Sequence, residues 1–294
     1  MQLTIKAYAK LNLMLDILSR LPNGYHDLFM VMQSVSLCDL VTLTENDSGL
    51  LTLSCDEPEI PTDARNLAHK AATCFFAETG LPFDGLHIHI EKHIPHAAGL
   101  AGGSADAAAV LVGLNRLHGN VLDTRNLIRI GASIGSDVPF CALGGLMLAQ
   151  HTGTLLSFLP TLPLGKVVIV KPDCAVSTGE AYKAFDTAER VRHLDKAGML
   201  QSILAGDADG VYRRVDNVFE QFIDVPERVT IKGILRRHGA VCACMSGSGP
   251  SVFGIFQQDA DAEAAANQLR QSFRQVFVCD CVERGSEELK IVAR

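Results

Sequence analysis

A glycine-rich segment at residues 94–104 constrains the fold of this chain more than any other stretch of its sequence. Before it, Leu86, Ile88 and Ile90 alternate with polar residues, a pattern typical of a half-buried strand. After it, apolar residues recur at helical spacing, with Ser104 as the predicted N-cap. Free backbone N–H groups at the start of such a helix bind anions, so the loop is a candidate phosphate site. An ordinary tight turn between strand and helix is the alternative.

The familiar phosphate-binding motifs are absent from the sequence. A P-loop requires serine or threonine after its Gly-Lys step, whereas the Gly-Lys step at 165–166 is followed by valine. The Gly-Ser-Gly at 247–249 lacks the third glycine of a dinucleotide fingerprint, because Val252 stands in its place. The H-R-D and D-F-G signatures of protein kinases do not occur. A phosphate site in the glycine loop therefore implies a different fold.

The remaining pattern is that of an α+β protein with two domains. The segment 160–165, rich in proline, leucine and glycine, separates the two halves. We therefore expect one domain over residues 1–158 and a second over residues 159–294. The predicted strands are 3–18, 30–43, 86–91, 166–171, 240–245, 247–256 (after a turn) and 275–282; the predicted helices are the one that starts at Ser104, and 66–78, 124–132, 180–205, 210–222, 225–238 and 261–273.

Composition narrows the classes of protein that this chain can belong to. Of its 294 residues, 48% are apolar, which suits a globular core and excludes disorder as the main state. A net charge of −7 argues against a protein that coats nucleic acid. The apolar runs are shorter than the roughly 18 residues of a membrane span, and the N-terminal residues lack the apolar core of a signal peptide. We expect a soluble cytoplasmic protein with neither a nucleic-acid nor a membrane partner; its oligomeric state stays open.

The nine cysteines are odd in number and scattered, which predicts reduced thiols. Two C-x-C pairs, Cys242/Cys244 and Cys279/Cys281, raise the alternative of a four-thiolate zinc site. Their spacing lacks the C-x2-C turn of most zinc ribbons. Both pairs also fall in strand-like runs, where alternate small side chains share one face. The sequence therefore favours buried thiols over zinc and leaves the role of the two pairs open.

Three further segments carry polar residues that could take part in chemistry. In the predicted strand 9–13, Lys10 and Asn12 share one face because strand side chains alternate. Asp137 stands in a rigid Gly-Ser-Asp-Val-Pro turn, and a second glycine/serine loop covers 245–251. Taken alone, such a lysine is most often solvated, and such an aspartate most often caps a helix or turn.

Together these segments resemble the GHMP kinase superfamily, whose members bind ATP with a glycine loop that is not a P-loop. The matching pieces, in the family's order, are A-K-L-N-L (9–13), G-Y-H (24–26), I-P-x-x-A-G-L-x-G-G-S-x-D-A-A-A (94–109), G-S-D-V-P-F (135–140) and M-S-G-S-G-P-S-V-F-G (245–254). The resemblance implies a two-domain α+β GHMP kinase fold with its active site in the cleft between the domains. The N-terminal domain would be ribosomal-protein-S5-domain-2-like, and the C-terminal domain ferredoxin-like.

The resemblance also implies an ATP-dependent kinase of small molecules that uses Mg²⁺. Within the superfamily, the motifs are most similar to those of kinases that phosphorylate an alcohol linked to cytidine diphosphate. The G-Y-H motif at 24–26 together with Tyr182 favours that cytidyl substrate. The alternatives are a superfamily kinase acting on mevalonate, homoserine or a sugar, and an inactive nucleotide-binding regulator on the same fold.

Roles for particular residues follow from the resemblance alone. Asp137 is implied as the general base, and Lys10 as the residue that polarises the hydroxyl and steadies the phosphoryl group. The implied substrate residues are Asn12, Tyr25, His26 and Tyr182, with the tyrosines stacking on cytosine and His26 reading its edge. The implied ATP contacts are Asn66, Lys92, Pro95, Ala97, Ala98, Gly99, Leu100, Ala101, Gly102, Gly103 and Ser104, and Ser104 is also the implied contact for Mg²⁺.

The glycine loop departs from the family pattern at two positions. Ala101 stands where the family usually has glycine, so a methyl group narrows the loop. Ala105 stands where a second small hydroxyl residue is common, which leaves Ser104 as the side-chain oxygen at that corner. These differences concern the fine geometry of the loop, because Gly99, Gly102 and Gly103 are retained.

Overall fold

The computed structural model describes residues 1–292. Its strands are β1 (Gln2–Arg20), β2 (His26–Glu45), β3 (Leu51–Cys55), β4 (Leu86–Glu91), β5 (Leu146–His151), β6 (Leu155–Phe158), β7 (Lys166–Lys171), β8 (Asp216–Asn217), β9 (Cys242–Met245), β10 (Val252–Phe256), β11 (Gln275–Val282) and β12 (Ser286–Val292). Its helices are α1 (Leu67–Thr79), α2 (Gly102–Leu117), α3 (Thr124–Ile134), α4 (Val138–Leu143), α5 (Thr178–Asp186), α6 (Lys196–Leu204), α7 (Ala208–Tyr212), the 3-10 turn η1 (Val218–Gln221), α8 (Arg228–Arg237) and α9 (Asp259–Leu269).

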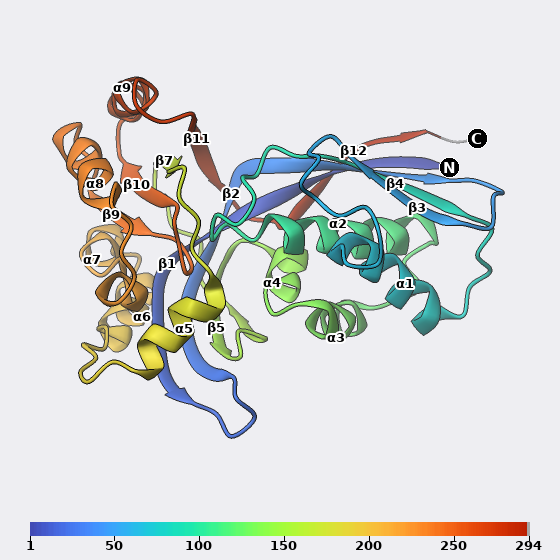
Figure 1. Ribbon diagram of the computed structural model, residues 1–294, viewed down its shortest axis with the longest axis horizontal. Coiled ribbons are helices and arrows are strands. Elements are labelled where there is room, and N and C mark those ends of the chain that lie inside the picture. The colour runs from blue at the N-terminus through green and yellow to red at the C-terminus, as the bar shows by residue number, and fades with distance from the viewer. Residues whose placement is uncertain (293–294) are drawn as a thin grey trace.

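Two long antiparallel strands form the spine of the molecule. Strands β1 and β2 have 19 and 20 residues and pair from Gln2 opposite Thr44 to Arg20 opposite His26. Most of their side chains are buried, because both strands run through the interior and are covered on both faces over much of their length. Figure 1 shows the two strands, in blue, running from one half of the molecule into the other.

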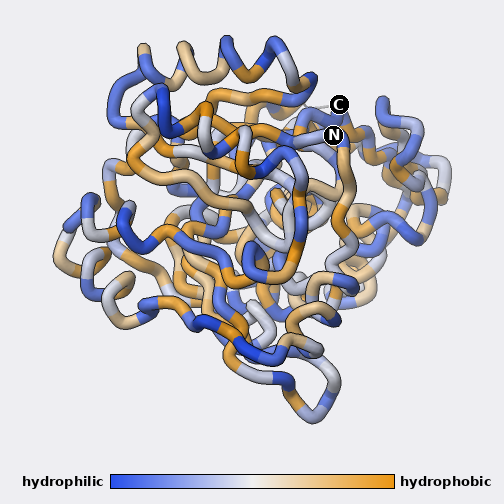
Figure 2. The backbone as a smooth tube through the Cα atoms, turned by 60° about the vertical axis from the view of Figure 1, so that its left-hand side comes forward, coloured by the Kyte–Doolittle hydropathy of each residue, from blue (hydrophilic) through white to orange (hydrophobic). Residues whose placement is uncertain are grey.

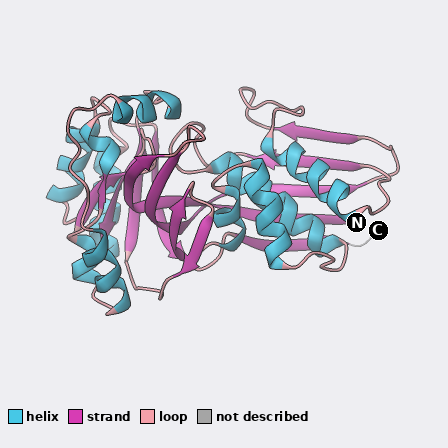
Figure 3. Cartoon of the chain, turned by 90° about the horizontal axis from the view of Figure 1, so that it is seen from below, coloured by secondary structure: helices cyan, strands magenta, loops and turns pink. Residues whose placement is uncertain are grey.

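In the first half, helices α1, α2 and α4 pack against a sheet built on this spine, and α3 packs on these helices. Strand β2 pairs with β4 and β5, and β1 pairs with β12. Helix α2 lies close on the sheet at Gly113, where a methyl group would overlap the side chains of Ile5 and Leu43. Figure 3 shows the helices of this half lying in front of its strands. The core beneath them includes Phe75 and Phe140.

The second half is an antiparallel sheet in the order β11-β7-β10-β9, with helices α8 and α9 packed on it. Their shared core includes Val168, Ile231, Leu235 and Phe256. Strand β11 also pairs with β2, so the two sheets are continuous. Figure 2 shows hydrophobic segments concentrated in the interior of the molecule and hydrophilic ones along its outer loops.

The division into 1–158 and 159–294 remains a proposal about domains. It falls in the connector between β6 and β7. After the second half has formed its sheet, the chain returns to the first half, where β12 pairs with β1 from Ala7 opposite Ser286 to Gln2 opposite Val292. The two ends of the described chain therefore lie side by side, as Figure 1 also shows.

The prediction that Ser104 caps the long helix is wrong. Helix α2 begins at Gly102, its N-cap is Ala101, and no side chain caps it. Ala101 has a left-handed backbone with φ of 61°, so this turn of the backbone, rather than a serine side chain, starts the helix. Ser104 therefore lies within the first helical turn.

The predicted helices 180–205 and 210–222 are each too long. Helix α5 ends at Asp186 and α6 starts at Lys196, because Asp195 accepts a hydrogen bond from the Gly198 N–H and caps a new helix. Helix α7 ends at Tyr212, and the chain then forms β8 and η1. Strands β3, β5, β6, β8 and β12 were not expected from the sequence.

The cysteines are all free thiols, as predicted. Strands β9 and β11, which carry the two C-x-C pairs, are separated in the sheet by β10 and β7. Within residues 1–292, no group of three or more histidine, cysteine, aspartate or glutamate side chains is arranged to hold a metal ion. The same residues contain no helix that is long and apolar enough to cross a membrane.

Candidate active site

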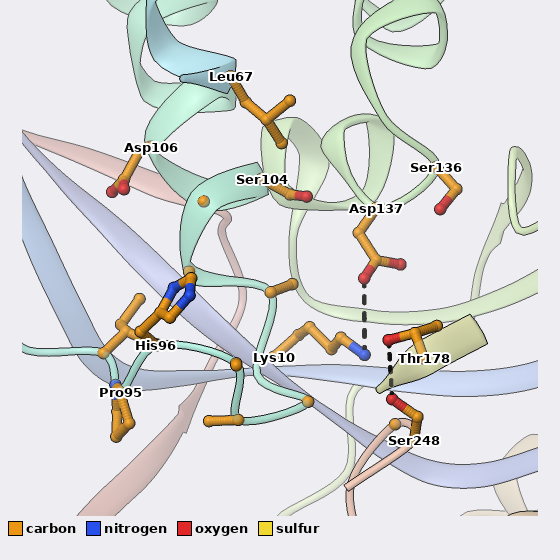
Figure 4. Close-up of a pocket in the computed structure, with 18 of the residues that line it drawn as sticks. Lys10, Leu67, Pro95, His96, Ser104, Asp106, Ser136, Asp137, Thr178 and Ser248 are labelled. Carbon is orange, nitrogen blue, oxygen red and sulfur yellow. Dashed lines mark hydrogen bonds and ion pairs between the residues drawn. The ribbon is translucent and has the colours of Figure 1, made fainter. Parts of the chain in front are cut away.

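A cavity of about 720 Å³ lies where the glycine loop, strand β1 and helix α5 meet. Its wall also includes the β1–β2 hairpin and residues 247–248 of the second glycine/serine loop. Most residues singled out by the sequence line it; Asn12 and Leu100 are the exceptions among the predicted substrate and ATP residues. Figure 4 shows the part of the cavity around Lys10 and Asp137.

Lys10 and Asn12 lie on one face of β1, as strand alternation predicts. Their side chains are buried, and Lys10 Nζ donates a 2.7 Å hydrogen bond to Asn12 Oδ1. Lys10 Nζ also lies 3.7 Å from Asp137 Oδ2. Asn12 therefore holds the lysine beside the carboxylate, while its own Oδ1 also accepts from the Gly247 N–H at 3.0 Å.

Asp137 occupies the N-cap position of α4, but its side chain makes no capping hydrogen bond. Pro139 lies in the first turn of this short helix. The carboxylate faces the cavity instead, with its side chain 29% exposed compared with 5% for Lys10. An acceptor that is free of local backbone bonds and beside a buried ammonium group is suited to taking a proton from a bound hydroxyl.

The glycine loop brings backbone N–H groups to the cavity. Ala97, Gly99 and Ala101 have positive φ angles of 49°, 73° and 61°, which fold the loop tightly before α2. The first turn of α2 has no acidic residue and no side-chain cap, so its N–H groups are available to an anion. The Leu100 carbonyl accepts from the Lys10 N–H at 3.1 Å, which attaches the loop to the catalytic strand.

The second glycine/serine loop holds the first one in place. Ser246 Oγ donates to the Gly99 carbonyl at 3.0 Å. A methyl group on Gly99 would overlap the Ser246 carbonyl oxygen, so the two loops are in backbone contact. Ser248 and Thr178 share a 3.0 Å hydrogen bond at the cavity wall, drawn as a dashed line in Figure 4. The sequence marked this loop as a motif but did not indicate that Ser246 positions the phosphate loop.

Asn66 and Lys92 line the cavity but are already bound to other groups. Asn66 is the N-cap of α1: its Oδ1 accepts from the Ala68 N–H at 2.8 Å, and its Nδ2 donates to the Pro61 carbonyl at 2.8 Å. Lys92 Nζ binds the carboxylates of Asp39 and Asp106. Direct contact of either residue with a nucleotide therefore stays a prediction.

The cluster of Lys92, Asp39 and Asp106 beneath α2 is a feature that sequence reasoning missed. Asp39 accepts from the N–H groups of His93 and Ile94 at 2.6 and 2.7 Å. Burial raises the pKa of Asp106, despite the opposing effect of Lys92. Burial would lower the pKa of Lys92, but the two carboxylates outweigh that effect and raise it. Asp106 belongs to the glycine-loop motif, so the sequence contained a signal for it; Asp39 had none.

Aromatic side chains also line the cavity. Tyr25, at the tip of the β1–β2 hairpin, is 65% exposed. The next residue, His26, is buried and stacks on Tyr182 with ring centroids 4.5 Å apart and an angle of 21° between the planes. Burial, and to a smaller extent the charge of Asp137, raises the pKa of Tyr182 to about 12. The structure thus brings together the residues predicted to bind a base, close to the Lys10–Asp137 pair.

Comparison with known proteins identifies the family of this chain. The profile of the GHMP kinases N terminal domain matches residues 66–145, and that of the GHMP kinases C terminal matches residues 199–275. A Brevibacillus brevis protein named 4-diphosphocytidyl-2-C-methyl-D-erythritol kinase is 41% identical over 100% of both chains. A Geobacillus kaustophilus protein of the same name is 43% identical over 94% of this chain and 96% of its own.

Solved structures of kinases also match this chain. The crystal structure of a 4-(cytidine 5'-diphospho)-2C-methyl-D-erythritol kinase matches with a TM-score of 0.79 and 31% identity, over 96% of this chain and 99% of that one. A homoserine kinase from Cytophaga hutchinsonii matches with a TM-score of 0.78 at 19% identity, over 98% of this chain and 97% of that one, which shows a shared fold alone. With both profiles and full-length relatives in agreement with the site, the chain belongs to the 4-diphosphocytidyl-2-C-methyl-D-erythritol kinase family of the GHMP kinases.

Proposed function

We propose that Asp137 and Lys10 carry out the phosphoryl transfer of this ATP-dependent kinase, with Asp137 as general base. The enzyme phosphorylates the 2-hydroxyl of 4-diphosphocytidyl-2-C-methyl-D-erythritol, a step of the non-mevalonate route to isoprenoid precursors. The main support for these two catalytic roles is the 3.7 Å distance between Lys10 Nζ and Asp137 Oδ2. The pair lies in one cavity with the glycine loop and the aromatic residues Tyr25, His26 and Tyr182.

The transfer step needs alignment and charge neutralisation more than covalent help from the protein. The substrate hydroxyl gives its proton to the Asp137 carboxylate as its oxygen forms a bond to the γ-phosphorus. The bond between that phosphorus and the bridging oxygen of ATP breaks, and ADP leaves with the electron pair. The Lys10 ammonium, buried and held by Asn12, stabilises the negative charge that develops on the attacking oxygen.

The N–H groups at the start of α2 are proposed to hold the ATP phosphates, because the helix dipole and its free donors both favour anions there. Mg²⁺ is the proposed cofactor. Ser104, which lines the cavity at the start of α2, offers a hard oxygen donor of the kind that Mg²⁺ prefers. This single donor fits an ion that arrives on the phosphates, and when bound the ion supplies charge neutralisation.

The cytidine end of the substrate is proposed to stack between Tyr25 and Tyr182, with His26 at the edge of the base. The stacked His26 and Tyr182 and the exposed Tyr25, which all line the cavity, support this placement. A cytoplasmic location is also proposed, since the nine free thiols suit a reducing compartment that supplies ATP.

A coupled assay of ADP release tests the function directly. Purified protein with Mg²⁺ and ATP should release ADP when 4-diphosphocytidyl-2-C-methyl-D-erythritol is added, and should stay inactive with homoserine, mevalonate or galactose. Turnover of one of those three alcohols in preference to the cytidyl substrate would overturn the substrate assignment. Inactivity toward all of them would favour a nucleotide-binding regulator.

A further inference from the structure

One acidic side chain outside the predicted site holds a residue inside it. Asp186 is the last residue of α5. Its Oδ1 forms a 2.8 Å hydrogen bond with His26 Nε2. Its other oxygen, Oδ2, lies 3.5 Å from Nη1 of Arg20 on β1. Helix α5 therefore binds the β1–β2 hairpin through His26, which also stacks on Tyr182 and contacts Phe185 edge-on.

This contact determines which ring nitrogen of a neutral His26 carries the proton. An ionised carboxylate only accepts hydrogen bonds, so the nitrogen facing Asp186 must be the donor. The Arg20 guanidinium pairs with the other oxygen of the Asp186 carboxylate. With the proton on Nε2, the opposite nitrogen, Nδ1, keeps its lone pair. Within residues 1–292, the structure gives Nδ1 no hydrogen-bond partner, so it remains available to a ligand.

The stacking fixes the plane in which that lone pair points. The rings of His26 and Tyr182 lie within 21° of parallel, 4.5 Å apart. A base stacked on Tyr182 beside His26 would lie in nearly the same plane as the imidazole. Hydrogen bonds to base edges are made in the plane of the base, so Nδ1 is oriented to accept from a donor on that edge.

Cytosine and uracil differ at this edge in whether the group at position 4 donates or accepts a hydrogen bond. Cytosine presents a 4-amino donor where uracil presents a 4-oxo acceptor. A lone pair on Nδ1 attracts the first and repels the second. We propose that Asp186 is a positioning residue that fixes the tautomer of His26, so that His26 Nδ1 accepts from the 4-amino group of cytosine and excludes uracil. This inference rests on the proposed cytidine site and adds to it the residue that makes the site selective.

Kinetics of Asp186→Asn test the proposal. An amide can either accept from or donate to Nε2, so the variant no longer imposes one tautomer. The KM for the cytidyl substrate should rise about tenfold or more, the effect of a weakened hydrogen bond to a base edge. The KM for ATP should stay unchanged. The preference of kcat/KM for the cytidyl substrate over its uridyl analogue should fall by a similar factor, and Asp186→Glu should restore most of it.

Two measurements separate positioning from a general structural effect. Glu180→Gln makes the same carboxylate-to-amide change at an exposed position of α5 and should leave both KM values unchanged. In the full-length wild-type enzyme at alkaline pH, ¹⁵N NMR should find His26 protonated on Nε2, and in Asp186→Asn a mixture of tautomers. A wild-type His26 protonated on Nδ1, or unchanged selectivity in Asp186→Asn, would overturn the proposal.

A failure of the proposed function can be distinguished from a failure of the role of Asp186. If the wild-type enzyme does not turn over the cytidyl substrate at all, the cytidine site itself is wrong. If the wild-type enzyme turns it over but Asp186→Asn discriminates cytidyl from uridyl substrates equally well, only the role of Asp186 is wrong.

Discussion

Lys10 and Asp137, the proposed catalytic pair, differ in how much water each one meets. The lysine is buried and held by Asn12, whereas the carboxylate is partly exposed to the cavity and free of capping bonds. We expect Asp137→Asn to lower kcat about 10²- to 10⁴-fold, because the amide cannot accept the hydroxyl proton. The affinity for ATP should change by less than a factor of about three, since the phosphates are held by the glycine loop. Steady-state kinetics and calorimetric titration with ATP measure the two quantities.

The control for Asp137→Asn is a measurement of the stability of the folded variant. Asn has the size of Asp, and position 137 makes no capping bond that could be lost. Apart from the loss of the 3.7 Å pair with Lys10, nothing is removed, so the variant should unfold cooperatively in denaturant with a midpoint close to that of the wild-type enzyme. A variant that keeps near-normal turnover would remove Asp137 from the role of base.

Gly99 is the residue where the two glycine/serine loops touch. Its φ of 73° and the adjacent Ser246 carbonyl both disfavour a side chain. We expect Gly99→Ala to lower the free energy of unfolding by about 2 kcal/mol or more and to weaken ATP binding, because the loop must move away from Ser246. Gly103→Ala is the matched control for stability, since its methyl group would meet only Leu67 Cδ1 at 4.0 Å. Equal stability of the two variants in urea titrations would contradict this account.

How far the sequence predicts the site depends on whether the residues of a contact are close in the chain. Lys10 and Asn12 share a strand face two residues apart, so alternation alone placed them together. Ser246 reaches Gly99 across 147 positions, and Asp186 reaches His26 across 160. Strand and helix periodicity carries no information about such contacts, because they depend on how the two halves of the chain pack together.

At the scale of elements, the start of helix α2 lies above a buried ionic cluster. One lysine and two aspartates leave one negative charge in excess, and burial raises the pKa of Asp106 from 3.8 to about 8. Asp39 is the carboxylate that accepts backbone N–H bonds, so Asp106 retains the proton. The folded enzyme therefore binds one proton more than the unfolded chain between these two pH values.

The sign of the pH effect follows from that extra proton. Stability from Asp106 is complete below the pKa of the unfolded chain and is lost as pH rises through about 8. Asp106→Asn keeps a neutral side chain at every pH, so its stability relative to wild type should rise from pH 5 to pH 8.5, by at most about 1.4 kcal/mol per pH unit. Urea unfolding across this range measures the difference. Asp173→Asn, at an exposed position, should show no such trend, and a flat difference for Asp106→Asn would refute the assignment.

The elements that the sequence predicted well are those with strong local patterns. The alternation at 86–91 matches β4, and 166–171 matches β7. Helix α2 was expected from its periodicity, but its start was misplaced because Ala101 adopts a left-handed backbone that alanine rarely takes. Strand β12 was missed because five of its seven residues are exposed, so it lacks the apolar pattern of a buried strand; its pairing with β1 is set by tertiary structure.

At the scale of the whole molecule, both halves supply the catalytic cavity. Strand β1, the N-cap of α4 and the glycine loop bring Lys10, Asp137 and free backbone N–H groups, whereas α5 and the loop at 245–251 come from the second half. Strands β11 and β12 join the halves by pairing with β2 and β1. A cavity formed in this way can receive two nucleotides that approach each other end to end, with the reacting groups meeting near Lys10.

The net charge of the whole chain, −7, opposes the binding of two polyanionic ligands, so a local source of attraction is needed. Among the described lysine and arginine residues that line the cavity, Lys10 and Lys92 already face carboxylates, and Arg65 pairs with Asp63 at 2.9 Å. The proposed sources of attraction for the phosphates are therefore the N–H groups of α2 and Mg²⁺. Both act at short range and are screened little by salt.

We therefore expect the KM for ATP with Mg²⁺ to change less than about threefold between roughly 0.05 and 0.3 M KCl. Removing Mg²⁺ with a chelator should abolish turnover and weaken ATP binding at least about tenfold, because the remaining N–H donors cannot neutralise the phosphates alone. Initial rates across the salt series, and ATP titrations with and without the ion, measure both effects. A steep rise of KM with salt would mean instead that an unpaired lysine or arginine reaches the phosphates when the ligands bind, and the ion pairs of Lys92 would be the first to test.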